Sequence, residues 1–432
     1  MNKTSTTGAT DAVQSEGPSL TRRTVVGSLV GAIAGAAVVG SGQARAAQSA
    51  TARGQVWDAV VVGAGVFGSW TAWHLRKQGK MVLLVDAWGP GHARASSGGE
   101  SRLTRTEYSG DELYTRFAWE SLDDWAALSQ RSELPVFHRI GALFIYRKEP
   151  ATLAASLALN QKLGAPMTRI ERADLLKRYP HLGLDGITFG VLQPTMGALM
   201  ARRSVLQLVS EFVAEGGTYQ QLAIQPPRSS GALDAITSVT GATLRSKQFI
   251  FACGPWLPKL FPDVIGTRIV PTRQEVFFFA PEPGDVRFEP SHLPAWVDAD
   301  EPGIPYGFPV LESRGFKIAI DAHGVRVDPD TGDRIVSAEG LKTVRNYLAR
   351  RFPSLAQRPL AESRVCQYEN SASGDFIIDR HPTWDNVCLL GGGSGHGFKH
   401  GPAVGRYVAA LVSGKLQQPE PRFALSQHEF QA

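Results

Sequence analysis

The sequence has little of several features that would mark a specialised protein. It contains only 3 cysteines in 432 residues, an odd number without the spacing of a disulfide framework. Internal repeats and low-complexity segments are missing, and no run of lysine or arginine follows the N-terminal region. With a formal net charge of only +5, this argues against a nucleic-acid partner. What remains is the composition of an ordinary globular protein, long enough for two domains.

The N-terminal region has the pattern of an export signal. The pair Arg22-Arg23 precedes a mildly apolar run, Val25–Val39, which is too short to cross a bilayer comfortably. Ala44-Arg45-Ala46 then follows as a cleavage pattern. We expect a twin-arginine signal peptide over 1–46, a linker over 47–55, and export by the twin-arginine machinery into the periplasm, cell envelope or medium, without a stable membrane span. The alternative is an N-terminal tail with incidental arginines.

A nucleotide-binding pattern opens the part of the chain that we expect to fold. The apolar run Trp57–Val62 predicts a strand buried on both faces of a parallel sheet. The fingerprint Gly63-x-Gly65-x-x-Gly68 follows it directly, and Val66–Gln78 predicts a helix. Met81–Val85 predicts a second buried strand, which ends in Asp86. Strand, fingerprint, helix, strand and acidic residue thus occur in the order that a dinucleotide-binding unit requires.

Each part of this pattern suits a dinucleotide. The glycines allow a tight turn, a close approach to pyrophosphate and close packing of helix on strand. The helix N-terminus offers free N–H groups to phosphates, and Asp86 offers a carboxylate to ribose hydroxyls. FAD and NAD use the same cradle, so the pattern does not choose between them, although a second fingerprint for a separate NAD domain is missing. The alternative is a glycine-rich turn in an unrelated α/β protein.

Further segments along the chain carry a family resemblance. In chain order they are Val85–Ala87, Ser96–Arg105, Tyr306–Pro309, Cys366–Tyr368, Asp375–Pro382 and Ser394–Lys399. Together they resemble the monomeric sarcosine oxidase and N-methyltryptophan oxidase group of the D-amino-acid-oxidase-like FAD-dependent oxidoreductases. The resemblance implies a mixed α/β fold with a Rossmann-like FAD-binding domain over 56–137, 195–262 and 366–425. A substrate domain with a mixed, mainly antiparallel sheet is implied over 138–194 and 263–365.

The resemblance also implies FAD as the cofactor and assigns its contacts. The residues concerned are Gly63, Gly65, Val66, Phe67, Gly68, Asp86, Ala87, Ser96, Arg102, Cys366, Gly395, Gly397 and Lys399. Cys366 matches the position whose sulfur bonds covalently to the flavin ring. A tether suits an exported enzyme, because a dissociated cofactor would be lost outside the cytoplasm. The alternative for Cys366 is a buried strand cysteine, which is our interpretation of Cys253 and Cys388.

The residues expected to act on the substrate come from four of these segments and from the apolar run around Lys317. Arg105 and Lys399 match the ligands of the substrate carboxylate, for which a guanidinium fork and a compact ammonium are suited; otherwise they are surface cations. Lys317 lies in an apolar strand pattern and matches the lysine that activates oxygen beside the flavin; otherwise it points to solvent. Tyr306 and Tyr368 match pocket tyrosines, or else are core rings. We expect no metal site.

The sequence departs from the family pattern at several positions around the expected site. Ser97-Gly98 stands where family members commonly have a histidine pair. Asp321 replaces an active-site histidine, with His323 nearby, and Glu369-Asn370 replaces the usual threonine after Tyr368. We expect these changes to leave the flavin chemistry intact, but they leave the identity of the substrate undetermined.

The resemblance implies an oxidase of α-amino acids, with a secondary or N-methylated amine and with oxygen as the acceptor. The products are then an imine, which hydrolyses to an aldehyde, and hydrogen peroxide. One alternative is a dehydrogenase of the same fold that passes electrons to a quinone or protein acceptor, and Lys317 argues against it. Another is a flavoprotein with a purely structural cofactor, and a third is an NAD-linked dehydrogenase. A monomer is favoured.

Overall fold

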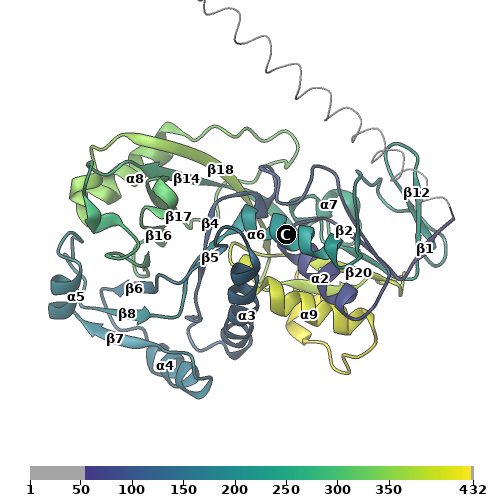
Figure 1. The fold of residues 1–432 in the computed structure, drawn as a ribbon, viewed down its shortest axis with the longest axis horizontal. Helices are drawn as coiled ribbons and strands as arrows, with labels where there is room; N and C mark the ends of the chain where they lie inside the picture. Colours follow the sequence, from purple (N-terminus) through teal and green to yellow (C-terminus); the bar gives the residue numbers. More distant parts are fainter. Residues whose placement is uncertain (1–53, 430–432) are drawn as a thin grey trace, which may run out of the picture. The chain divides into compact units, whose positions relative to one another are not determined.

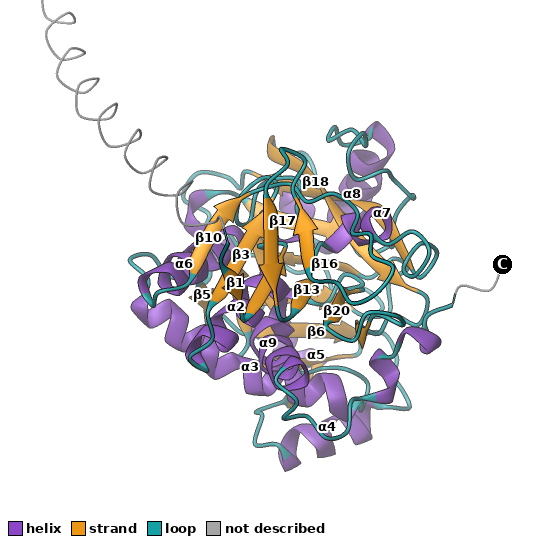
Figure 2. Cartoon of the chain, turned by 90° about the vertical axis from the view of Figure 1, so that its right-hand side faces the viewer, coloured by secondary structure: helices purple, strands orange, loops and turns teal. Residues whose placement is uncertain are grey.

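Two large β-sheets dominate the protein in the computed structural model, which describes residues 54–429 (Figure 1). The signal peptide expected over 1–46 and most of the expected linker lie outside the described residues. Figure 2 shows the strands gathered in the interior, with helices arranged around them. The expected combination of a parallel FAD-domain sheet with a mainly antiparallel second sheet is confirmed.

The first large sheet is mainly parallel and carries the nucleotide-binding pattern. In spatial order its strands are β10 (Thr218–Gln221), β3 (Val82–Asp86), β2 (Ala59–Val62), β13 (Phe249–Phe251), β20 (Val387–Gly391) and β19 (Ile377–Arg380). β19 pairs with β20 in antiparallel fashion, and the other pairs are parallel. All of β2 is buried, because both faces of this sheet are covered.

Helices cover one face of this sheet, and a small sheet covers the other. The helical layer contains α2 (Val66–Lys77), α3 (Glu112–Arg131), α6 (Ala201–Ala214) and α9 (Gly401–Val412). The small sheet contains β1 (Val56–Trp57), β12 (Thr243–Ser246) and β11 (Ala235–Thr237). Val61 of β2 packs in one core with Trp70 of α2, whereas Val60 packs with Leu244 of β12. Neighbouring residues of β2 therefore pack against opposite layers, because successive side chains of a strand point to opposite faces of the sheet.

The second large sheet is mainly antiparallel. In spatial order its strands are β18 (Leu360–Ser371), β14 (Ile269–Phe279), β17 (Phe316–Ile320), β16 (Pro305–Phe308), β15 (Ala295–Asp298), β6 (Ala142–Tyr146), β8 (Phe189–Gln193) and β7 (Thr168–Glu171). β15 and β6 pair in parallel. Phe316 and Ile318 of β17 pack in a core with Leu348 of α8 (Ala338–Arg351). Lys317 and Ala319 therefore face the other way, toward the nucleotide-binding part of the chain.

A fourth sheet and three further α-helices complete the arrangement of the described residues. The sheet contains β4 (Ser101–Thr104), β9 (Gly197–Met200) and β5 (Phe137–His138). The other helices with more than one turn are α4 (Leu153–Lys162) and α5 (Arg172–Arg178), and α7 (Leu257–Leu260) is a single turn. β18 runs without interruption through residues 365 and 366, where the sequence places a domain boundary. The domain boundaries themselves stay a prediction.

Some elements differ locally from the sequence-based expectation. The strand predicted over Trp57–Val62 is interrupted at Asp58, because Trp57 pairs with β12 while β2 belongs to the large sheet. Met81 is exposed and precedes β3 rather than opening it. Cys253 lies after the end of β13 rather than in a strand, whereas Cys388 is buried in β20 as predicted. The three cysteines are free.

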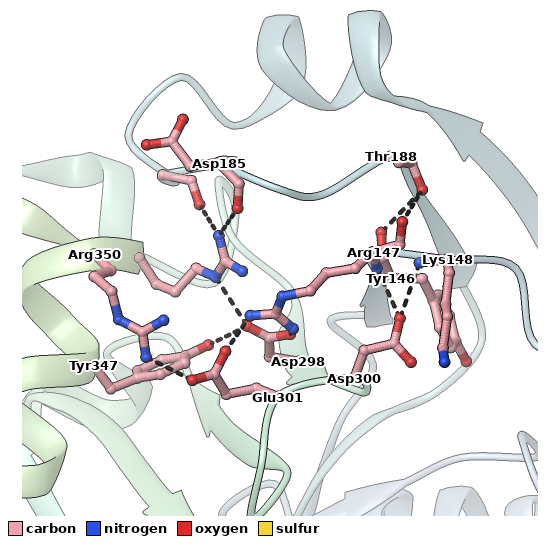
Figure 3. A network of polar contacts seen from close by, with 12 residues as sticks. Tyr146, Arg147, Lys148, Asp185, Thr188, Asp298, Asp300, Glu301, Tyr347 and Arg350 are labelled. Atoms are coloured by element: carbon pink, nitrogen blue, oxygen red, sulfur yellow. Dashed lines mark hydrogen bonds and ion pairs between the residues drawn. The ribbon is translucent and has the colours of Figure 1, made fainter.

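A buried ionic network joins the second sheet to α8 (Figure 3). Asp298, at the end of β15, is fully buried and accepts hydrogen bonds from Nε of Arg351 at 2.9 Å, Nη1 of Arg147 at 3.1 Å and the hydroxyl of Tyr347 at 3.2 Å. Glu301 contacts Arg147 as well, which links the two acids. The network fixes the loop after β15, and this loop contributes to the wall of the site described below.

The described part of the chain offers neither a membrane-spanning helix nor a cluster of metal-binding side chains. None of the helices within residues 54–429 is long and apolar enough to cross a membrane. The same residues contain no group of three histidine, cysteine or acidic side chains placed to hold a metal ion.

Candidate active site

Two cavities lie along the border between the large sheets, with a narrow space between them. The first has a volume of about 420 Å³ and is lined by residues of the fingerprint. The second has a volume of about 460 Å³ and is lined by Arg105, Cys366 and Lys399. The narrow space shares Ser96 with the first cavity and Arg102 with the second. The three spaces therefore form one elongated site that ends among cationic side chains.

The first cavity is shaped by glycines that leave no room for side chains. Gly63 has φ +106°, and a Cβ there would lie 2.3 Å from the carbonyl oxygen of Ala252. A Cβ on Gly68 would lie 1.9 Å from the carbonyl oxygen of Gly63, so this glycine serves the packing of helix on strand. Gly65, Val66, Phe67 and Ala87 line the cavity itself. The cradle predicted from the fingerprint is thus formed, with Gly68 beneath it rather than at its surface.

Asp86 has a larger structural role than the sequence suggested. Its Oδ2 accepts a hydrogen bond from the N–H of Ala64 at 2.8 Å, and its Oδ1 accepts from the N–H groups of Trp88 at 2.8 Å and Gly89 at 3.0 Å. The carboxylate therefore braces the loops on either side of the cavity while it still lines the cavity wall. The remaining lone pair, on Oδ2, is available to a ribose hydroxyl.

The residues around the first cavity fit a dinucleotide that carries hydroxyl and phosphate groups. The first free N–H of α2, on Val66, is bound by Oγ of Ser97 at 3.0 Å, which leaves the next N–H groups of the helix for phosphate. Glu369 is buried, which raises the pKa of its carboxyl to about 8, and its Oε2 has no hydrogen-bond partner among the described residues. The hydroxyl of Ser96 is likewise buried and unpaired within that part of the chain. The hydroxyls of a ribityl chain, which both donate and accept, would supply the missing partners.

Cys366 lies at the junction of the second cavity with a smaller one. It belongs to β18, and its Sγ is 3.5 Å from Nη2 of Arg102 in β4. The smaller cavity, of about 30 Å³, is lined by Arg102, Cys366 and Lys317. Lys399 lines the second cavity. The structure therefore brings Cys366 between the two lysines that the sequence predicted around a flavin ring.

The ammonium group of Lys317 is buried, and the side chain that carries it points away from the apolar core. Its exposed fraction is 3%, which excludes the solvent-facing alternative. Nζ donates hydrogen bonds to the carbonyl oxygen of Ser101 at 2.6 Å and to its hydroxyl at 3.1 Å. Burial, reinforced by the charge of Arg102, lowers the pKa of Lys317 well below its usual range. An anion beside Nζ would raise this pKa again, so the lysine is suited to respond to negative charge in the site.

Arg105 and Lys399 form the cationic end of the second cavity. Nζ of Lys399 donates to the hydroxyl of Tyr108 at 2.8 Å and to the carbonyl oxygen of His396 at 2.7 Å. The guanidinium of Arg105 lies over the ring of Tyr108, 3.9 Å from its centre. Burial, and next the charge of Arg105, lowers the pKa of Lys399 well below its usual range. Both side chains therefore favour a carboxylate, which restores charge balance to the cavity.

A buried aromatic and imidazole cluster behind Lys399 was not predicted from the sequence. The hydroxyl of Tyr108 lies 2.6 Å from Nε2 of His400 and 3.3 Å from Nδ1 of His396. Burial lowers the pKa of both histidines well below the usual range, so both rings are neutral at pH 7. The only signal in the sequence is that both histidines flank Lys399, while Tyr108 arrives from a distant segment. The cluster holds Lys399 in place without adding charge.

The remaining predicted residues line the same spaces. Tyr306 and Tyr368 line the second cavity, and burial raises the pKa of Tyr306 to about 12 and that of Tyr368 well above its usual range. Gly395 and Gly397 line the narrow space. Among the departures from the family pattern, Asp321 lines the second cavity, whereas His323 is exposed outside its wall.

The chain matches a known family over most of its length. Residues 58–411 match the family DAO, described as FAD dependent oxidoreductase. The chain belongs to this family. Monomeric sarcosine oxidase from Streptomyces avermitilis is 29% identical to this FAD-dependent oxidoreductase over 371 residues, which cover 84% of this chain and 95% of that protein. N-methyl-L-tryptophan oxidase from Salmonella heidelberg is 26% identical over 368 residues, which cover 83% of this chain and 95% of that protein.

A solved structure shares the fold of this FAD-dependent oxidoreductase. L-proline dehydrogenase from P. horikoshii superposes with a TM-score of 0.75 at 19% identity, covering 86% of this chain and 97% of that one. The family resemblance, the fold class and FAD as the cofactor, all expected from the sequence, are confirmed.

Proposed function

We propose that the protein is an oxidase of α-amino acids with a secondary or N-methylated amine, and that it uses oxygen as the electron acceptor. The observation that carries the proposal is the convergence of Arg105 and Lys399 on the cavity that Cys366 enters from the opposite sheet. In support, two relatives are named as oxidases of sarcosine and of N-methyl-L-tryptophan. The products are an imine, which water hydrolyses to an aldehyde and an amine, and hydrogen peroxide, which is formed from oxygen.

The residues of the second cavity hold the substrate and control its protonation. Arg105 and Lys399 bind the carboxylate, which orients Cα–H toward the junction at Cys366. Tyr306 and Tyr368 enclose the amine. Their rings exclude water, which favours the neutral amine whose lone pair is needed to form the imine. A bound flavin supplies the acceptor for the two electrons.

We propose that Cys366 tethers the cofactor and that Lys317 promotes the reaction of the reduced cofactor with oxygen. Cys366 is the one cysteine of the three that lines the cavity holding Arg105 and Lys399. Lys317 is buried on the other side of this thiol, where a cation stabilises negative charge that develops on oxygen. The rival function is a dehydrogenase of the same fold with a quinone or protein acceptor. The buried position of Lys317 favours the oxidase.

An anaerobic bleaching screen followed by a peroxide assay tests the function. The panel consists of sarcosine, pipecolate, N-methyltryptophan, proline and glycated amino acids. We expect that at least one bleaches the flavin without air and releases peroxide when air is admitted. Bleaching without peroxide, together with reduction of a quinone, would favour the dehydrogenase. A flavin that none of the amino acids bleaches would contradict both functions.

We further propose that the enzyme acts outside the cytoplasm after twin-arginine export. The support is in the sequence alone, in the pair Arg22-Arg23 and the cleavage pattern at Ala44-Arg45-Ala46. Replacing both arginines of the pair by lysine should leave the protein, with its signal attached, in the cytoplasm of a host that exports the natural chain. Equal export of both forms would argue against this route.

A further inference from the structure

One carboxylate in the second cavity lacks the partners that its neighbours have. The acids that line this cavity are Glu107, Asp300 and Asp321. Glu107 accepts hydrogen bonds from the N–H of Ser109 at 2.9 Å and from the hydroxyl of Ser156. Asp300 accepts from the N–H groups of Arg147 at 2.7 Å and Lys148 at 3.2 Å. Asp321, by contrast, has a buried Oδ1 with no hydrogen-bond partner among the described residues.

The strand before Asp321 determines where this side chain lies. Lys317 and Ala319 occupy the face of β17 that looks toward the site, and Asp321 continues the same alternation just past the end of the strand. Ala319 is paired with Tyr306 of β16. Burial raises the pKa of Tyr306 to about 12, and the charge of Asp321 adds to this rise. The carboxylate therefore lies close enough to the tyrosine-lined part of the cavity to act on its electrostatics.

Asp321 and Lys399 line the same cavity without pairing. The charge of Asp321 partly offsets the fall in the pKa of Lys399 that burial and Arg105 cause. No ion pair within 4.0 Å joins Asp321 to any cation in the part of the chain that the structure describes. A partly buried carboxylate without a partner is costly, and opposite charges separated by a cavity favour a ligand that is itself dipolar.

We propose that Asp321 binds the cationic nitrogen of a zwitterionic substrate whose carboxylate lies at Arg105 and Lys399. The position of the substrate carboxylate rests on the proposed function. The inference goes beyond that function because it names the protonation state, a zwitterion, in which the substrate binds. Asp321 is thus a specificity-determining residue: it selects amino acids over simple carboxylates. The nitrogen then loses its proton inside the cavity, with the carboxylate of Asp321, whose Oδ1 has no partner among the described residues, as the acceptor.

Two ligands of the same shape test separately what each end of the cavity contributes to binding. Glycine betaine has a carboxylate and a quaternary nitrogen, which has no lone pair and is not oxidised. In 3,3-dimethylbutanoate a carbon atom replaces this nitrogen, so only the positive charge is lost. Dissociation constants for both are measured on the flavin-loaded protein by the shift in flavin absorbance and by calorimetry. The natural protein should bind glycine betaine more tightly, by about tenfold.

Variants at Asp321 show whether this preference comes from its charge. Asp321→Asn should reduce the ratio of the two dissociation constants to about one, by weakening glycine betaine alone, whereas Asp321→Glu should keep the preference. Asp300→Asn is the matched control, because backbone N–H groups already bind that carboxylate, and its ratio should stay that of the natural protein. Thermal unfolding of each variant establishes that it is folded.

The outcomes distinguish this inference from the proposed function. If both ligands bind equally well to the natural protein, or if Asp321→Asn leaves the ratio unchanged, the role of Asp321 is wrong while carboxylate recognition stands. If neither ligand binds to the natural protein, recognition of the carboxylate by Arg105 and Lys399 is wrong, and the inference is overturned with it.

Discussion

The Sγ atom of Cys366 lies 3.5 Å from Nη2 of Arg102, although the two residues are far apart in the sequence. The same Nη2 donates a hydrogen bond to the carbonyl oxygen of Ser96 at 2.8 Å, and Ser96 belongs to the wall of the first cavity. Arg102 therefore connects the nucleotide-binding cradle to the strand that carries the thiol. This contact joins the two halves of the site.

Cys366→Ser tests the tether at this junction. Acid precipitation should leave the natural protein yellow and should release the FAD of the variant, because a thioether survives denaturation and non-covalent contacts do not. Cys253→Ser is the matched control, since Cys253 lines only the first cavity, and it should keep its colour. Equal release of FAD from natural protein and Cys366→Ser would show that the sulfur forms no bond to the flavin.

Lys317→Met tests the role of the buried lysine in the reaction with oxygen. Reoxidation of the reduced flavin by air should slow by about 100-fold, because one preorganised cation is lost next to the developing charge, whereas anaerobic reduction by substrate should change far less. Stopped-flow absorbance measures the two half-reactions separately. Lys162→Met, at an exposed position, should change neither rate. An equal slowing of both half-reactions would assign Lys317 a structural role.

Arg105→Ala tests recognition of the carboxylate. The KM for an amino-acid substrate should rise by about tenfold or more, since the guanidinium fork is lost, while the KM for the matching amine without a carboxylate should stay nearly unchanged. Steady-state peroxide release measures both constants. A similar rise for both substrates would place carboxylate recognition elsewhere.

The lowered pKa of Lys399 predicts that carboxylate binding depends on pH. The bound carboxylate stabilises the ammonium and raises the pKa of Lys399, so binding takes up a proton wherever the free lysine is neutral. The affinity for 3,3-dimethylbutanoate should therefore fall as the pH rises above the lowered pKa, by at most about tenfold per pH unit. His396 and His400 are neutral over the same range because burial lowers the pKa of both.

Lys399→Met provides the check on this assignment. The variant should bind the anion more weakly and should lose the pH dependence, because the titrating group is gone. A flat profile in the natural protein would mean that Lys399 stays charged in the free enzyme. A slope that persists in Lys399→Met would assign the proton to another group.

Asp298→Ala tests the buried network that supports the wall of the second cavity. The substitution leaves the guanidinium of Arg351, which is 2% exposed, without its carboxylate. The free energy of unfolding should fall by about 3–5 kcal/mol, measured by denaturant titration. Glu112→Ala removes an ion pair whose side chains are 68% and 56% exposed, and the loss there should stay within about 1 kcal/mol. Equal losses of unfolding free energy in the two variants would show that the buried network stabilises the fold no more than an exposed ion pair does.

The nucleotide cradle was predictable because its parts are close together in the sequence. The run that ends at Val62, the glycines after it and Asp86 define strand, turn, helix and strand by local rules, and the structure places these elements at or near the predicted residues. The break at Asp58 was not visible, since it depends on β12, a distant partner of Trp57. Local propensity describes a segment and does not identify its partner.

The sequence by itself determined the family, the βαβ unit with its glycines and the residue types that flavin chemistry needs, because these are carried by short motifs. Only the tertiary structure decided that Lys317 is buried, that Tyr108 meets His400, and that Oδ1 of Asp321 has no hydrogen-bond partner within residues 54–429. Burial and pairing are properties of segments brought together from distant parts of the chain. The cost of an unpaired charge therefore arises only once the two sheets have met.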